Sequence, residues 1–447
     1  WDTQLARVKA TFRTERERRI FYTAMYHFMV APQTWCDVSG DYMGADLQVR
    51  RCAKYETLTT WSLWDTYRAA HPLATIIMPD RMADYAHTMM AIYREHGELP
   101  MWHLVSNETY CMVGEPGIPV LADMILKDEC GDIDREEAFQ AMKASLLPTE
   151  YAQVRRLPLR GKDYLADLGY LPYDGREGET VAKNLEYYLA SWAVAGKLGH
   201  KEDSVRFHNL SQNYRKLWDK RVMCMRAVDT KGNLRPLPDD FNPQYQTGDY
   251  TEGNPWQYAF LVPHDVNGLA ELMGGKAALD ARLDALLSAP SDLGDNHNPD
   301  ISGLIGQYAH GNEPSHHVLY MYNYVGQPRK TQRRVRQVMD ELYSDQPAGL
   351  CGNEDVGQMS AWYIMSALGL YQVEPCGGVY QLGSPIVEEA VIPLPGDKTF
   401  TIRTHGGSDK AVYVKKYVLN GKTLKGTTIL HSQIMAGGTL DVYMTAK

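Results

Sequence analysis

The stretch Met82-Ala-Asp-Tyr-Ala-His-Thr-Met-Met-Ala-Ile-Tyr93 has the residue spacing of a helix. Its apolar side chains recur at three- and four-residue steps, and Gly97 follows where the pattern ends. This spacing lines one side of a helix with apolar groups, and glycine commonly ends a helix. The pattern returns in later segments, at 181–192, 205–218, 335–343 and 359–369. We therefore expect helices joined by long loops over most of the chain.

The order of these segments narrows the fold class further. Strands and helices do not alternate, which disfavours a doubly wound parallel sheet. No helical repeat of fixed length is visible, which disfavours a solenoid. Many helices with Gly- and Pro-rich loops are typical of an α/α toroid, in which helical hairpins surround a central cavity. We assign this toroid to residues 1–372.

The pattern changes after residue 372. Thr399-Phe-Thr-Ile-Arg-Thr404 alternates between apolar and polar residues, and Asn420-Gly421 stands between two strand-like runs. Asn-Gly in that position is a strong signal for a two-residue hairpin. We expect a small antiparallel β-domain at 373–447.

The composition excludes several classes of protein. The 447 residues carry a formal net charge of −9 without a long basic run, which argues against a nucleic-acid surface. No segment approaches 18 uncharged apolar residues, so we expect no transmembrane segment. The seven cysteines are scattered and form no C-x-x-C pair, a pattern of neither a disulfide framework nor a zinc ribbon.

Chemistry-bearing residues gather in the predicted loops, the usual place for functional groups on a rigid scaffold. Trp64, Asp65 and Arg68 lie close together in the first of these loops. A carboxylate and a guanidinium flanked by aromatic rings suit the binding of sugar hydroxyls from two sides. A structural Asp65–Arg68 pair at a helix start is the alternative.

A second loop offers one aromatic face and three polar groups in a short span. These residues are Trp102, His103, Asn107 and Glu108. Trp102 would serve either as a platform for a sugar ring or as part of the core.

A third loop contains Glu252 before a Gly-Asn-Pro turn, with Trp256 and Tyr258 following. Aromatic surroundings would desolvate the carboxyl and raise its pKa, as a general acid working near neutral pH requires. A position at a helix N-terminus would instead lower the pKa. Both interpretations stay open at this point.

Two further loops are rich in oxygen donors. Asn312 and Glu313 lie in a Gly/Pro-containing segment, and amide and carboxylate oxygens suit Ca²⁺. The nearby histidines would suggest zinc, but no H-E-x-x-H spacing is present. Glu354 and Asp355 form an acidic pair between glycines.

These loops together resemble glycoside hydrolase family 92, the calcium-dependent exo-acting α-mannosidases. The matching segments follow one another from about residue 20 to 400, so the resemblance covers most of the chain. They are Phe21-Tyr-Thr-Ala-Met-Tyr-His27, Trp64-Asp-Thr-Tyr-Arg68, Asn107-Glu-Thr109, Glu252-Gly-Asn254 with Trp256, His310-Gly-Asn-Glu-Pro314, and Glu354-Asp355 with Gly357-Gln-Met-Ser-Ala-Trp362.

The resemblance implies an (α/α)6 barrel followed by a β-structure, and an inverting exo-α-mannosidase that acts on mannose-rich glycans. Glu252 would be the general acid and Asp355 the general base, with carboxyls about 6.5–9.5 Å apart. The Ca²⁺ cofactor would be held with help from Asn312 and Glu313. The outer hydroxyls of the terminal mannose would bind Asp65 and Arg68.

The second-loop residues and His310 complete the implied substrate site, with His310 facing the neighbouring sugar. The family further implies export from the cytoplasm, to the periplasm or the medium. Its members normally begin with a β-sandwich domain that packs on the barrel, and this chain does not include it. We expect that domain to be a partner of the chain.

Two positions depart from the family pattern. Many members carry an acidic residue where this chain has Asn353, and members specific for α-1,2 linkages have a His-Glu pair where this chain has His310-Gly311. The linkage therefore stays open. A non-catalytic glycan-binding toroid and a polysaccharide lyase are the alternatives, and a lyase would need a basic cluster that is not evident here.

Overall fold

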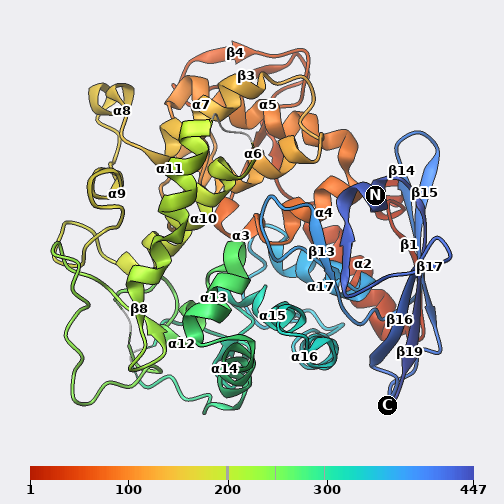
Figure 1. The fold of residues 1–447 in the computed structure, drawn as a ribbon. Coiled ribbons are helices and arrows are strands. Elements are labelled where there is room, and N and C mark those ends of the chain that lie inside the picture. The colour runs from red at the N-terminus through yellow and green to blue at the C-terminus, as the bar shows by residue number, and fades with distance from the viewer. Residues whose placement is uncertain (198–200, 247, 296) are drawn as a thin grey trace.

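The computed structural model describes residues 1–197, 201–246, 248–295 and 297–447, and helices dominate up to residue 369 (Figure 1). The opening stretch forms α5 (Pro79–His96), and Gly97 ends it with a φ of 103°. The other predicted segments are helical as well, although the third tightens into a 3-10 helix, η1 (Gln212–Leu217). The prediction of a mainly helical first part is confirmed.

The helices of the first half are α1 (Asp2–Leu5), α2 (Glu15–Phe28), α3 (Leu63–Thr66), α4 (Ala70–Ile77), α6 (Gly117–Leu126), α7 (Arg135–Leu146), α8 (Glu150–Arg155), α9 (Lys162–Leu168), α10 (Thr180–Lys197) and α11 (Lys201–Ser211). Those of the second half are α12 (Pro255–Tyr258), η2 (Pro263–Asp265), α13 (Val266–Met273), α14 (Lys276–Ser288), η3 (Glu313–Ser315), η4 (Val318–Tyr320), α15 (Met321–Tyr324), α16 (Pro328–Glu341), α17 (Gln358–Leu368) and α18 (His431–Met435).

Short strand pairs interrupt the helical part. They are β2 (Gln33–Thr34) with β5 (Leu58–Thr59), β3 (Asp41–Met43) with β4 (Val49–Arg51), β6 (His103–Leu104) with β7 (Asn107–Glu108), β8 (Trp218–Asp219) with β9 (Cys224–Met225), and β10 (Leu304–Ile305) with β11 (Tyr308–Ala309). Three further strands, β12 (Leu370–Tyr371), β13 (Val379–Leu382) and β18 (Thr428–Leu430), form a small sheet where the helical part ends.

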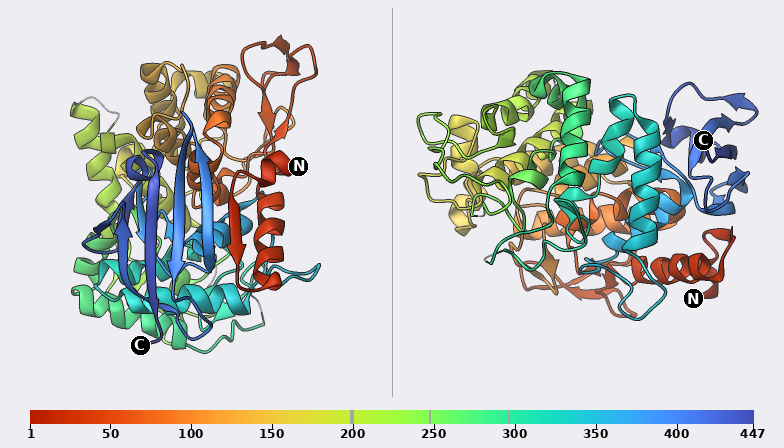
Figure 2. Two further views of the ribbon diagram at one scale, coloured as in Figure 1. Left: turned by 90° about the vertical axis from the view of Figure 1, so that its right-hand side faces the viewer. Right: turned by 90° about the horizontal axis from the view of Figure 1, so that it is seen from below.

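A six-stranded sheet forms most of the C-terminal part, and Figure 2 shows it face-on at the left. Its order is β1 (Lys9–Phe12), β14 (Val387–Leu394), β15 (Lys398–His405), β19 (Gly438–Thr445), β16 (Tyr413–Leu419) and β17 (Lys422–Thr423). The edge strand β1 comes from the other end of the chain, outside the predicted range 373–447. The sheet therefore joins the two ends of the sequence.

The prediction of a purely antiparallel sheet is wrong for one pair. Strands β15 and β19 run parallel from Phe400↔Gly438 to His405↔Tyr443. Parallel neighbours need a long connection, and here it contains β16 to β18 and α18. The predicted Asn420-Gly421 hairpin is confirmed, because Leu419 pairs with Lys422 across it.

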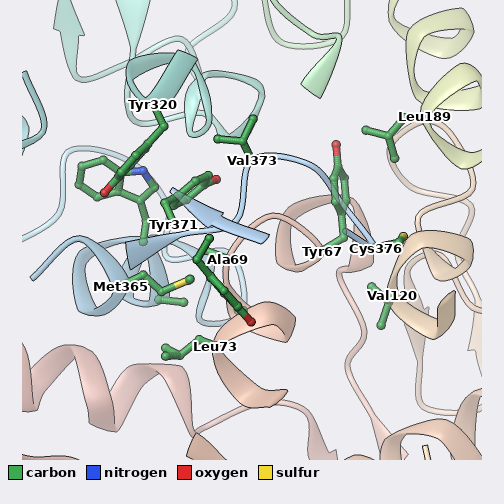
Figure 3. Close-up of a cluster of buried hydrophobic side chains, with 14 of the residues drawn as sticks. Tyr67, Ala69, Leu73, Val120, Leu189, Tyr320, Met365, Tyr371, Val373 and Cys376 are labelled. Carbon is green, nitrogen blue, oxygen red and sulfur yellow. The ribbon is translucent and has the colours of Figure 1, made fainter. Parts of the chain in front are cut away.

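One hydrophobic cluster extends through both parts of the chain. It includes buried side chains from Val8 near the start to Met444 near the end. Figure 3 shows a section of it around Tyr320 and Tyr371, whose rings stack with centroids 4.7 Å apart. The site described next therefore lies on a continuous core. None of the helices in the described parts of the chain is long and apolar enough to span a bilayer.

Candidate active site

The loop before α12 holds Glu252 in a defined backbone conformation. Asn254 caps α12 by accepting a hydrogen bond from the Trp256 N–H at 2.9 Å, while its own N–H donates to the Gln257 side chain at 2.8 Å. Glu252 precedes this cap and has a φ of 47°, a strained value for a residue other than glycine. Such strain persists only where the surrounding structure enforces it.

The electrostatic surroundings of Glu252 favour its protonated form. Burial, followed by the negative charge of Asp300, raises the pKa of Glu252 to about 7. The charge of Asp355 adds to this effect, and a hydrogen bond from Asn312 opposes it. The sequence left open whether a helix dipole would lower this pKa, and the structure favours the raised value.

The hairpin β10–β11 links this loop to the oxygen-rich loop. At its turn, the Gln307 side-chain oxygen accepts from Asn254 at 3.0 Å, and the Gln307 carbonyl accepts from Gln257 at 2.7 Å. Beyond its second strand, the Asn312 amide donates to the Glu252 carbonyl at 2.6 Å and to its carboxylate at 3.3 Å. Two of the predicted site residues are therefore in direct contact.

Three carboxylates from distant segments meet beside this contact. Oxygens of Asp65, Glu313 and Asp355 all lie within 4.8 Å of one another. Asp65 and Glu313 are buried, and one Glu313 oxygen, Oε1, has no hydrogen-bond partner among the residues that the structure describes. Burial, then the charges of Asp65 and Asp355, raises the pKa of Glu313 well above its usual range. Clustered carboxylates of this kind require either bound protons or a cation.

The backbone conformation around Asp355 positions the third carboxylate of the cluster. Asp355 and Val356 have φ values of 52° and 57°, and α17 starts directly after this turn. The Gln358 side chain then accepts from the N–H groups of Ala69 and Ala70 at 2.9 and 3.0 Å. This anchor holds the start of α17 against the segment that carries Asp65.

Arg68 has a different partner from the one considered in the sequence. Its guanidinium donates to Glu186 at 2.9 Å and stacks 5.1 Å from the Trp64 ring centroid. Asp65 instead accepts from the Ser62 hydroxyl, and among the described residues no Asp65–Arg68 ion pair is found. Glu186 was not among the residues predicted from the sequence. A carboxylate within the apolar pattern at 181–192 is nevertheless a signal of a buried ion pair.

The second loop is held together by one of its own predicted site residues. The Glu108 carboxylate accepts from the N–H groups of Met101, Trp102 and Tyr110 at 2.9–3.0 Å. Asn107 is exposed, and its side-chain amide donates within this loop to the Val105 carbonyl at 3.4 Å. The hydrogen bonds of Glu108 and Asn107 thus stabilise the conformation of this loop.

The two aromatic residues of this loop differ in exposure. Trp102 is half-buried, and His103 is buried with neither ring nitrogen hydrogen-bonded. Burial lowers the pKa of His103 to about 4, so the ring is neutral at physiological pH.

The expectation that His310 faces a sugar does not fit its position. Its ring is fully buried between two tyrosine hydroxyls, 2.8 Å from that of Tyr308 and 2.7 Å from that of Tyr343. Both nitrogens are used, so the ring offers no free atom to a ligand. In the part of the chain that the structure describes, the only group of three or more His, Cys, Asp or Glu side chains close enough to share a metal ion consists of carboxylates.

Asp300 belongs to the site, although it was not among the residues predicted from the sequence. It accepts a hydrogen bond from Asn353 at 3.2 Å, and its charge raises the pKa of both Glu252 and Asp355. Asp300 lies in a loop without periodicity, before strands of only two residues, so no sequence pattern identifies it as a site residue.

Comparisons with known proteins agree on one family. The glycosyl hydrolase family 92 catalytic domain matches residues 1–446. The GH92 α-mannosidase BT3965 from Bacteroides thetaiotaomicron superimposes with a TM-score of 0.91 at 35% identity, over all of this chain and 58% of that one. Its complex with mannoimidazole gives a TM-score of 0.92 at the same identity, over all of this chain and 59% of that one.

One more relative is a mannosidase of this family, and another is described only as a glycosidase. The GH92 inverting mannosidase BT2199 from the same species has a TM-score of 0.88 and 33% identity, over all of this chain and 62% of that one. A secreted glycosidase of Arthroderma benhamiae, itself uncharacterized, is 25% identical over 95% of this chain and 52% of its own length. The chain thus spans little more than half the length of these proteins. On the match from residue 1 to residue 446, it belongs to glycosyl hydrolase family 92.

Proposed function

We propose that the chain is the catalytic part of a calcium-dependent, inverting exo-α-mannosidase that releases terminal mannose from mannose-rich glycans. The observation that carries the proposal is that Glu252, with its raised pKa, senses the charge of Asp355, and that Asp355 shares a carboxylate cluster with the buried Asp65 and Glu313. An acid and a base of this kind are what glycoside hydrolysis with inversion requires.

Glu252 would act as the general acid. Its pKa of about 7 keeps the carboxyl largely protonated in mildly acidic solution, ready to donate to the departing glycosidic oxygen. The Asn312 amide holds the carboxylate in place. Asp355 would be the general base that takes a proton from the attacking water.

The carboxylate cluster fits a hard divalent cation. The buried Glu313 has an unpartnered oxygen and lies beside Asp65 and Asp355. Oxygen donors of this type are those that Ca²⁺ prefers. We propose that Glu313 holds Ca²⁺ with help from the Asn312 segment and the neighbouring carboxylates. When bound, the ion supplies positive charge that orients the sugar hydroxyls and keeps Asp355 ionised.

The remaining assignments are proposals of the same kind. Trp64, Asp65 and Arg68 would bind the terminal mannose, with Trp102 and His103 near it. The helices of residues 1–372 would form an (α/α)6 barrel, and residues 373–447 a C-terminal β-rich domain. A β-sandwich partner domain and an extracytoplasmic location, in N-glycan degradation, complete the proposal. The relative described as secreted supports the location.

The test is mannose release from α-1,2-, α-1,3-, α-1,4- and α-1,6-linked mannobiosides, with added calcium and with chelator. We expect release from at least one substrate, loss with chelator and recovery with calcium. Calcium should also raise the melting temperature of the wild-type chain, but not that of Glu313→Gln. No release with calcium present, even after a family β-sandwich domain is added, would instead indicate a glycan-binding protein without activity.

A further inference from the structure

Three loops cross at glycines beside the candidate acid. A Cβ at Gly311 would overlap the Ser302 hydroxyl and lie 3.0 Å from the Cys351 carbonyl oxygen. A Cβ at Gly352 would lie 2.5 Å from the Gly311 carbonyl oxygen, and one at Gly303 would meet the Cys351 sulfur at 2.5 Å. The three backbones therefore touch directly, and the loop around residue 300 takes the space that a side chain at position 311 would occupy.

This loop is fixed rather than loosely attached. The Gly311 N–H donates to the Ser302 carbonyl at 3.0 Å, which extends the β10–β11 pairing toward Asp300. Ile301 is buried in a small separate core with Leu293 and Ala309. The Asn298 side chain accepts from the Asp300 N–H at 2.9 Å. Asp300 is thus presented in a set position next to the segment of Asn312 and Glu313.

The position of Asp300 is on the side of the site where Glu252 acts. The Gly311–Ser302 hydrogen bond places its loop beside Asn312, whose amide donates to the Glu252 carbonyl, and the charge of Asp300 raises the pKa of Glu252. Glu252, as the proposed acid, contacts the glycosidic oxygen and so faces the leaving group. One oxygen of the Asp300 carboxylate accepts from the Asn353 amide at 3.2 Å, and among the described residues no hydrogen bond to the other oxygen is found. Asp300 is half-buried and Asn353 is exposed, so a ligand can reach both.

We propose that Asp300 and Asn353 bind hydroxyl groups of the leaving-group sugar, and so set which neighbouring sugar the enzyme accepts. The proposal rests on the proposed function. A carboxylate that accepts and an amide that both donates and accepts suit two adjacent hydroxyls of a sugar ring.

The test compares two substrates that share the terminal mannose. One is the mannobioside that the chain cleaves best, and the other is 4-nitrophenyl α-mannoside, whose leaving group has no sugar hydroxyl. Asp300→Ala and Asn353→Ala should each lower kcat/KM on the mannobioside about 10- to 100-fold, mainly by raising KM. The loss of one polar contact to the substrate typically reduces kcat/KM about tenfold. On the aryl mannoside the change should stay below about threefold when each variant is measured at its own pH optimum, because removal of the Asp300 charge also lowers the pKa of Glu252 and Asp355 and so shifts the pH profile. Asp295→Ala removes an exposed carboxylate of the same loop and is the matched control.

The outcomes separate this proposal from the proposed function. Equal losses on both substrates, or no loss on the mannobioside, would overturn the assignment while the mannosidase activity stands. If the wild-type chain cleaves neither substrate, even with calcium and an added family β-sandwich domain, the proposed function fails. The same variants are then compared by calorimetric binding of methyl mannobioside and methyl mannoside, where an unchanged affinity ratio overturns the assignment.

Discussion

At the scale of single residues, the proposed acid role of Glu252 gives the most specific prediction. Glu252→Gln should reduce turnover of natural mannosides about 10²–10⁴-fold, because the departing sugar oxygen needs a proton. A mannoside with a good leaving group, such as 2,4-dinitrophenol, should be spared because it leaves as a stable anion. The measurement is kcat/KM on both substrates.

Two variants serve as comparisons. Asp355→Asn should slow both substrates alike, because water activation is needed whatever the leaving group. Glu271→Gln changes an exposed carboxylate on α13 and should change neither rate. Equal loss on both substrates in Glu252→Gln would rule out the acid role.

The sequence predicted some of these residues well and others poorly, for physical reasons. The oxygen-rich loop singled out Glu313, which the fold places beside Asp65 and Asp355. For Glu252 the local sequence left two interpretations open, a pKa raised by aromatic surroundings or lowered at a helix start. The position of His310 does not follow from the local sequence, because its two tyrosine partners include Tyr343, 33 residues away. The Arg68–Glu186 pair spans 118 residues. Contacts made only by the fold leave little trace in local spacing.

At the scale of elements, the crossing of glycine loops predicts a sharp cost for one methyl group. Gly311→Ala should destabilise the protein by about 1–3 kcal/mol, because a Cβ there overlaps the Ser302 hydroxyl and presses on the Cys351 carbonyl. The measurement is the free energy of unfolding from urea titration.

Gly178→Ala is the matched control for this variant. A Cβ at Gly178 would meet no atom within 4 Å, so we expect a change within about 0.5 kcal/mol. If Gly311→Ala is as stable as Gly178→Ala, the loops have room to separate. Asp300 would then not be held as described.

Glu129 follows α6 and lies beside His431 of α18, and the ionisation of its carboxyl opposes folding. Burial raises the pKa of Glu129 to about 7, from about 4.3 in an unfolded chain. The folded state therefore binds the proton more tightly, and stability falls as the pH rises between these values. Above pH 7 the cost is fully present, on the order of 1 kcal/mol for a half-buried group.

Glu129→Gln removes this cost and gives a prediction with a defined sign. The variant should be more stable than the wild type at pH 8, and the difference should vanish near pH 4. Urea unfolding at both pH values measures it, with Glu271→Gln as the exposed control. A difference that is the same at pH 4 and pH 8 would contradict the raised pKa.

Elements were predictable to the extent that they repeat a pattern. The long helices have a 3.6-residue period, and Asn420-Gly421 marks a hairpin by its turn chemistry. The two-residue strands β10 and β11 are too short for any period, so the hairpin beside Glu252 was missed. The parallel β15–β19 pair joins segments separated by intervening strands, and local sequence carries no information on such pairing.

At the scale of the whole molecule, the hydrophobic cluster that runs from Val8 to Met444 predicts that the chain unfolds as one unit. The C-terminal sheet includes β1, so the boundary at 372/373 does not separate two independent cores. We expect one calorimetric transition whose calorimetric and van 't Hoff enthalpies agree.

Ile402 is fully buried in β15, and Ile402→Ala should cost about 2–5 kcal/mol. That cost should lower the midpoint of helix unfolding, measured by circular dichroism at 222 nm, as much as it lowers the midpoint of the sheet. Lys415→Ala, an exposed change on β16, should move neither midpoint. Two separate transitions, or helices that keep their midpoint in Ile402→Ala, would show that the helical part is stable without the sheet.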